Sequence, residues 1–142
     1  MQNTQYMLIV MAALGMTSGA HAADFKVIAN AGIKVSEISA NDLKDVFLAT
    51  KTSLRDGTHV EPVWEKGGAT HEAFLKEYVG KSDAAVGTYF RGLVFTGKAS
   101  MPKSVATDAD MVAFVEKTKG AIGYVAATTS TGSAKFSTLS KR

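Results

Sequence analysis

The chain has 142 residues, of which 46% are hydrophobic and 20% are charged, a balance typical of a folded protein rather than a disordered one. Its 16 basic and 13 acidic residues leave a formal net charge of +3, and no cluster of Lys and Arg indicates a nucleic-acid-binding face. The absence of cysteine excludes disulfides, thiol catalysis, zinc–thiolate sites and iron–sulfur clusters.

The N-terminal segment has the pattern of a secretion signal. Tyr6–Met16 is an apolar run that is shorter than the roughly 20 residues that a helix needs to span a bilayer. An Ala-His-Ala sequence ending at Ala22 then provides a small-x-small cleavage pattern, although residues 1–5 lack the usual Lys or Arg. We expect a signal peptide over residues 1–22, export to the periplasm, and a mature domain over residues 23–142.

The first elements of the mature chain are a strand and a helix. Phe25–Ala29 alternates in hydrophobicity and predicts a strand. Ser39 has the chemistry of a helix N-cap, and Asp42 lies where an acid in the first helical turn is favourable. Apolar residues then recur at helical spacing, so we expect a helix that ends near Thr50.

A turn and a second strand follow this helix. Asp56-Gly57 is typical of a tight turn and leads into a short strand over residues 60–64. Pro62 lacks an N–H group, so its presence indicates a sheet edge or the end of a strand. The pair Gly67-Gly68 precedes another predicted helix, which ends at Gly80.

The C-terminal half continues the alternation of helices and strands. Ser82-Asp83 begins a helix with apolar residues at a clear helical period, and a further helix lies between Thr107 and Gly120. A buried strand over residues 121–125 and a short strand over residues 135–139 complete the chain. This order predicts an α/β domain with three or four strands and about four helices.

One short motif resembles a nucleotide-binding loop but fails the chemical test. Gly92–Lys98 fits the pattern GxxxxGK, which cradles phosphates when it follows a strand. Ala99 stands where the magnesium-binding hydroxyl is needed, and the preceding residues have a helical pattern. We therefore expect no nucleotide site here.

The sequence contains no recognisable catalytic constellation or metal-ligand spacing. His59 and His71 are predicted to be surface residues, and Glu65 and Glu72 have no spacing that defines an acid–base pair. We therefore expect a protein that is not an enzyme and that binds neither a metal nor a cofactor.

The most suggestive segment for binding a ligand is Lys66, Gly67, Gly68, Ala69 and Thr70. A strand, a glycine-rich turn and a helix start would bring several backbone N–H groups together, and the helix dipole would favour an anion there. The Lys66 ammonium and the Thr70 hydroxyl would add contacts. A plain tight turn with a helix cap explains the same residues, and the pattern alone does not decide between the two.

Several blocks between residues 28 and 125 occur in a recognisable order: Ile38–Leu43, Asp45–Leu48, Arg55–Gly57, the glycine-rich segment ending in Thr70 and Phe74, Leu93–Gly97 and Gly120–Val125. Together they resemble the middle section of periplasmic phosphate-binding proteins of ABC transporters. Full-length members have two lobes that close on an anion, whereas this chain resembles a short, single-lobe member.

The resemblance implies a phosphate-like oxyanion as the ligand, with weak or altered binding. The family's loop resembles Arg-Ser-Asp-Gly-Ser-Gly-Thr, but here Trp64 replaces the arginine, Lys66 the aspartate and Gly68 the serine. Loss of the arginine removes a bidentate, charge-assisted clamp on the oxyanion. The alternative is a ligand-free interaction or sensor module in which Trp64 anchors a membrane or periplasmic protein partner.

Overall fold

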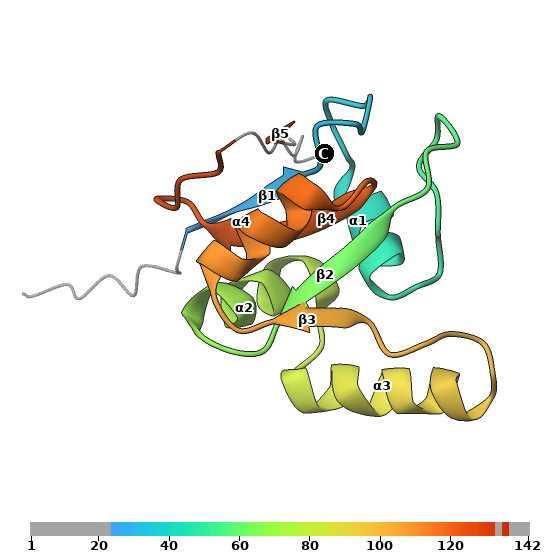
Figure 1. Ribbon diagram of the computed structural model, residues 1–142. Helices are drawn as coiled ribbons and strands as arrows, with labels where there is room; N and C mark the ends of the chain where they lie inside the picture. The colour runs from blue at the N-terminus through green and yellow to red at the C-terminus, as the bar shows by residue number, and fades with distance from the viewer. Residues whose placement is uncertain (1–23, 133–134, 137–142) are drawn as a thin grey trace, which may run out of the picture.

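A mixed β-sheet forms the middle of the domain in the computed structural model, which describes residues 24–132 and 135–136 (Figure 1). The strand order is β3-β2-β4-β1-β5, with β1 at Phe25–Ala29, β2 at Glu61–Glu65, β3 at Lys103–Val105, β4 at Ala121–Ala126 and β5 at Lys135–Phe136. The helices are α1 (Ala40–Phe47), α2 (Ala69–Phe74), a π-helical turn η1 (Leu75–Val79), α3 (Asp83–Phe95) and α4 (Asp108–Lys117). The expected signal segment lies outside the described residues, as does the predicted last strand beyond Phe136.

Three neighbouring strands of the sheet run in the same direction. β2 is parallel to both β3 and β4, whereas β1 is antiparallel to β4 and to β5. The carboxyl ends of β2, β3 and β4 therefore lie at one edge of the sheet. Pro62 pairs with β4 near the start of β2, and β3 pairs with β2 only from Val63 onward, so the position of Pro62 as a strand end is confirmed.

Helices cover both faces of this sheet. Alternate residues of β4 point to opposite sides, so that Ile122 and Tyr124 pack towards α1 and α2, while Ala121 and Val125 pack towards α4. Figure 1 shows α4 in front of β1 and β4, with α1 and α2 behind the sheet. Burial of β4 on both faces agrees with its nearly continuous apolar sequence.

Capping residues begin three of the four α-helices. The Ser39 Oγ accepts from the backbone N–H of Asp42 at 3.1 Å, and the buried residues Ile38 and Leu43 occupy the positions of a hydrophobic staple. Ser82 and Thr107 cap α3 and α4 in the same way. The three predicted helix starts are therefore confirmed.

The α/β class and the four helices match the prediction, and β3 is the strand that the sequence pattern missed. Only three residues long, β3 has no alternation of its own, and its pairing with β2 defines it. The predicted helix after Gly67-Gly68 is also less regular than expected, because α2 passes directly into η1 before Gly80 ends it with a positive φ of 70°. Within the described part of the chain, no helix is long and apolar enough to cross a membrane.

We predict that Gly120→Ala destabilises the fold more than Gly57→Ala does. Both glycines have a positive φ, 81° and 83°, so an alanine at either position is strained. A Cβ at Gly120 would lie only 2.6 Å from the carbonyl oxygen of His59, whereas a Cβ at Gly57 would meet no heavy atom within 4 Å. The steric clash should cost roughly 1–3 kcal/mol more at Gly120, measured by urea unfolding. Equal losses in the two variants would contradict this account.

Candidate functional site

The predicted ligand segment lies at the sheet edge where the parallel strands end. Lys66 directly follows β2, and its backbone N–H donates to the carbonyl of Val105 in β3 at 3.0 Å. Gly68, with φ 97°, forms the N-cap position of α2. In open α/β sheets, ligands bind in the crevice outside the carboxyl ends of the strands. The structure thus places the segment at the edge where such a site is expected.

The five residues of this segment form a short turn, Lys66–Gly68, and the first two residues of α2, Ala69 and Thr70, and the turn is open to solvent. Lys66, Gly67, Gly68 and Ala69 are exposed, and Thr70 is half-buried. A Cβ added to either glycine would meet no heavy atom within 4 Å, so the space beside them is free. No side chain among the described residues caps α2, and the first N–H groups of a helix have no acceptor inside it.

Trp64 does not share this exposure. Its side chain is 4% exposed and packs edge-to-face against Phe47, Phe74 and Phe90, with ring centroids 5.1 to 6.1 Å apart. Neighbouring residues of a strand point to opposite faces, and the face that Trp64 occupies is covered by helices. The hypothesis that Trp64 anchors a partner is therefore wrong, because the indole belongs to the core.

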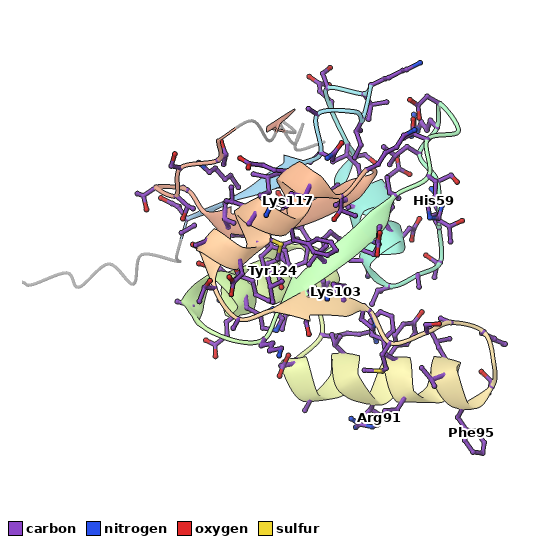
Figure 2. All side chains as sticks on the ribbon, in the orientation of Figure 1. His59, Arg91, Phe95, Lys103, Lys117 and Tyr124 are labelled. Atoms are coloured by element: carbon purple, nitrogen blue, oxygen red, sulfur yellow. The ribbon has the colours of Figure 1, made fainter. Side chains whose placement is uncertain are left out.

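His71, predicted to lie on the surface, is instead buried in a polar chain behind the loop. Its ring is 2% exposed, and its Nδ1 lies 2.5 Å from the Tyr124 hydroxyl oxygen (Figure 2 labels Tyr124). The other ring nitrogen, Nε2, lies 2.8 Å from the Asp83 carboxylate. The sequence offered no signal for this burial, because Tyr124 lies 53 residues away in the chain. His59 is exposed, as predicted.

The proton positions in this chain follow from its donors and acceptors. Tyr124 Oη accepts from the backbone N–H of Glu65 at 2.9 Å, so its own proton is available for His71 Nδ1. His71 Nε2 carries a proton and donates it to Asp83, because an ionised carboxylate can only accept. Burial also raises the pKa of the Tyr124 hydroxyl. The arrangement joins β2, β4, α2 and the start of α3, and both ring nitrogens of His71 take part in it.

A pair of carboxyl groups, the buried Glu65 and the half-buried Asp108, lies on the other face of the same edge. Glu65 is 5% exposed and hydrogen-bonds to Asp108 at the start of α4, not to Glu72, which is exposed. Asp108 also accepts from the backbone N–H of Ala126 at 3.1 Å and from the Thr129 hydroxyl at 2.8 Å. The pair therefore ties the end of β2 to α4 and to the end of β4.

One proton is shared within this pair. Burial, followed by the hydrogen bond and the charge of Asp108, raises the pKa of Glu65 to about 8. Burial opposes ionisation of Asp108 as well, but the hydrogen bonds from Glu65, Thr129 and Ala126 outweigh it and lower its pKa. Near neutral pH the Glu65 carboxyl is therefore protonated and donates to the Asp108 carboxylate. Its Oε1 is buried without a hydrogen-bond partner.

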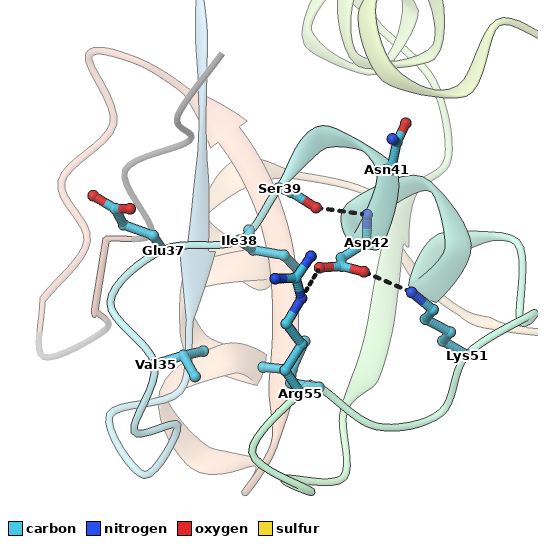
Figure 3. Close-up of a pocket in the computed structure, with 9 residues that line it drawn as sticks. Val35, Glu37, Ile38, Ser39, Asn41, Asp42, Lys51 and Arg55 are labelled. Atoms are coloured by element: carbon cyan, nitrogen blue, oxygen red, sulfur yellow. Dashed lines mark hydrogen bonds and ion pairs between the residues drawn. The ribbon is translucent and has the colours of Figure 1, made fainter. Parts of the chain in front are cut away.

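Apart from the Lys66–Thr70 segment, a groove lies at the opposite edge of the sheet, beside the start of α1 (Figure 3). It has a volume of about 790 Å³, and Asp42 at its wall binds Lys51 Nζ at 2.6 Å and Arg55 Nε at 3.3 Å. The hydrogen bond from Lys51 is the largest influence that lowers the pKa of Asp42. Lys51 and Arg55 are the cations that line this groove, and Asp42 pairs with both of them. Their positive charge is therefore partly neutralised and attracts an anion less strongly.

The GxxxxGK segment ends a helix, in agreement with the exclusion of a nucleotide site. The backbone N–H of Gly97 donates to the carbonyl of Val94 at 3.1 Å, and that of Lys98 donates to Leu93 at 2.9 Å. These N–H groups close α3 and are not available to a phosphate.

Comparison with known proteins identifies the fold. No protein-family model and no curated protein sequence matches the chain. Solved structures do match: an ABC-type phosphate transport receptor from Vibrio cholerae has a TM-score of 0.62 at 13% identity, over 82% of this chain and 46% of that one. PstS from Borrelia burgdorferi has a TM-score of 0.63 at 10% identity, over 84% and 48%.

A third match was solved with bound phosphate. This Clostridium perfringens protein, assigned provisionally to the phosphate ABC transporter substrate-binding proteins, has a TM-score of 0.63 at 15% identity, over 82% of this chain and 44% of that one. The chain therefore spans less than half the length of the structures that it matches. Its single-lobe α/β fold, expected from the sequence, corresponds to one half of those binding proteins.

We predict that the Glu65 carboxyl makes the fold less stable as pH rises. Between its ordinary pKa of 4.5 and about 8, the unfolded chain loses this proton while the folded chain keeps it. The unfolding free energy should therefore fall by up to about 1.4 kcal/mol per pH unit in this range and level off above it. Glu65→Gln retains an N–H donor for Asp108 and should remove this slope.

Urea unfolding from pH 5 to 9 measures this effect. Glu72→Gln, which changes an exposed carboxyl, serves as the control and should keep the wild-type slope. A Glu65→Gln variant with an unchanged slope would show that Glu65 is already ionised in the folded protein.

We also predict that Tyr124→Phe costs about 2–4 kcal/mol of stability. The change leaves the Glu65 N–H and the His71 ring without their partner inside the protein, and each unsatisfied buried group costs about 1–3 kcal/mol. Tyr89→Phe removes a single hydrogen bond to the Leu48 carbonyl and should cost about 1 kcal/mol. Equal losses in chemical unfolding of the two variants would refute the bridging role of Tyr124.

Proposed function

We propose that this chain is an exported solute-binding-type protein that binds a phosphate-like oxyanion weakly at Lys66–Thr70. The observation that carries the proposal is the open, uncapped loop at the carboxyl ends of β2, β3 and β4. The fold shared with half of several phosphate ABC transporter binding proteins supports it. The secretion pattern at the N-terminus supports a location in the periplasm.

The chemistry of the loop favours an anion of low charge, bound with modest affinity. Backbone N–H groups at the start of α2 would bind the oxygens, the Lys66 ammonium would contribute a point charge, and the Thr70 hydroxyl would contribute a hydrogen bond. No arginine is present in the loop, and Glu72 and Asp83 place exposed carboxylates nearby. Because the loop is open to solvent, the dissociation constant should be in the millimolar range, which corresponds to a binding free energy of about −4 kcal/mol.

Binding is favoured over catalysis because the loop lacks an activated nucleophile. Thr70 is the only hydroxyl residue in the segment, and the neighbouring His71 uses both ring nitrogens for Tyr124 and Asp83. A hydrolase would need a base within hydrogen-bond reach of the nucleophile. Two of the solved structures that share the fold are named as a phosphate transport receptor and as a provisional phosphate ABC transporter substrate-binding protein.

We expect phosphate to bind the wild-type protein at millimolar concentration and Lys66→Glu and Thr70→Ala to weaken it. Lys66→Glu reverses a charge at the loop and should lower affinity at least about tenfold, while Thr70→Ala should lower it several-fold. Chemical-shift titration or calorimetry with phosphate and sulfate measures both effects. Lys76→Glu, with the same charge change on an exposed residue of η1, is the control and should bind normally. The absence of any response in the wild type would reject the proposal.

A further inference from the structure

The end of α3 forms an exposed apolar and basic surface, which we name the α3 tip. Phe95 is 93% exposed, Met101 is 58% exposed and Val94 is 42% exposed, and these are the large hydrophobic side chains that the described residues leave open to solvent. Arg91 and Lys98 complete the tip and are also exposed. A single exposed apolar residue is ordinary, but these three lie within eight residues of the chain, and grouped apolar side chains with a polar rim are typical of an interaction site.

Positive charge surrounds the exposed ring. The chain between residues 84 and 107 contains three cations and no Asp or Glu. Arg91 lies one helical turn before Phe95, and Lys98 lies three residues after it, so a cation flanks the ring on each side. Figure 2 shows Arg91 and Phe95 projecting from the side of α3 that faces away from the sheet.

These two cations are not neutralised by the domain itself. Neither Arg91 nor Lys98 forms an ion pair with any residue in the described part of the chain. The third cation, Lys103, is occupied differently, because its Nζ lies 5.5 Å from the centre of the Phe114 ring. The tip therefore presents two free positive charges and three apolar side chains.

Charge and shape decide which occupant fits the tip. A second copy of the chain would bring like charges together in a symmetric contact, which disfavours self-association. A stable protein interface needs about 800 Å² on each partner with a packed apolar centre. The α3 tip has instead one ring at the outer end of the outermost helix in Figure 1, a shape that suits insertion better than flat packing.

We propose that the α3 tip docks the protein on an anionic phospholipid surface, with Phe95 inserted among the headgroups. An aromatic or aliphatic side chain enters the interface of a bilayer, while Arg and Lys remain at the level of the phosphates. Each cation near an anionic leaflet strengthens binding about fivefold. One inserted ring and two cations together give weak binding, so the domain can dissociate from the membrane again.

Docking through this surface leaves the proposed anion loop accessible. Asp83, at the start of α3, bonds to His71 beside the loop, and the 13 residues of α3 place the tip about 20 Å further along the helix. The membrane contact and the anion loop are therefore separate, and either can be tested without the other.

The test measures how variants of the full chain bind vesicles of phosphatidylglycerol and of phosphatidylcholine. All variants keep the same residues 1–23, so that differences report on α3 alone. We expect wild-type protein to sediment more with the anionic vesicles and Phe95→Ala to bind them about tenfold more weakly. Arg91→Gln combined with Lys98→Gln should also lower this binding about tenfold or more. Lys76→Gln combined with Lys81→Gln removes the same charge elsewhere and should have little effect.

A second measurement reports insertion directly. Phe95→Trp keeps an aromatic ring at the tip, and its fluorescence should be quenched by brominated phosphatidylglycerol, whereas the buried Trp64 of the wild type provides the unquenched baseline. Two results would overturn the proposal. One is no quenching of the tryptophan in Phe95→Trp. The other is an equal loss of vesicle binding in the variant Arg91→Gln with Lys98→Gln and in the control variant Lys76→Gln with Lys81→Gln. The first result would leave an acidic protein as the occupant of the tip.

Discussion

The hydroxyl group of Tyr124 is the contact on which the arrangement of this domain depends. It accepts from the backbone of β2 and hydrogen-bonds to His71 of α2, which in turn bonds to Asp83 at the start of α3. One side chain of the central strand thus sets the positions of three other elements. Without disulfides, the domain relies on such buried contacts and on apolar packing to hold its segments in place.

At the edge of the sheet where β2, β3 and β4 end, the buried polar side chains hold the elements together, whereas the segment Lys66–Thr70 is open to solvent. Glu65 and Asp108 lie on one face and His71 and Tyr124 on the other, and all four hydrogen-bond to neighbouring groups that hold the strand ends together. The loop Lys66–Thr70 lies above them with its glycines open to solvent. Rigid support beneath an open backbone loop is the arrangement that a binding site needs, since the N–H groups must be positioned before the ligand arrives.

The domain matches about half the length of the solved structures that share its fold. The single domain covers both faces of its own sheet with helices, so it does not need a second lobe to complete its core. An anion bound at Lys66–Thr70 would stay in contact with water, because the space beside Gly67 and Gly68 is open, and this contact would limit affinity. The α3 tip, with its unpaired cations and exposed ring, is the feature through which the protein would dock on an anionic membrane surface.

Sequence reasoning reached the fold because local chemistry dominates there. The N-caps at Ser39, Ser82 and Thr107 and the apolar run of β4 depend on neighbours a few residues away, and these predictions were confirmed. The glycine-rich turn and the helix start within Lys66–Thr70 were also predicted correctly, because glycine acts on the local backbone. Binding at this loop stays a prediction.

Only the tertiary structure decided which side chains were buried and with which partners. Trp64 and His71 have no sequence signal that separates a surface role from a core role, because their burial depends on helices that are distant in the chain. The pairing of Glu65 with Asp108 and the short strand β3 likewise arise from contacts across the sheet edge. The sequence by itself determined the class of fold and the helix starts, since these follow from periodicity and capping, whereas the polar chain and the exposed tip follow from how the elements pack.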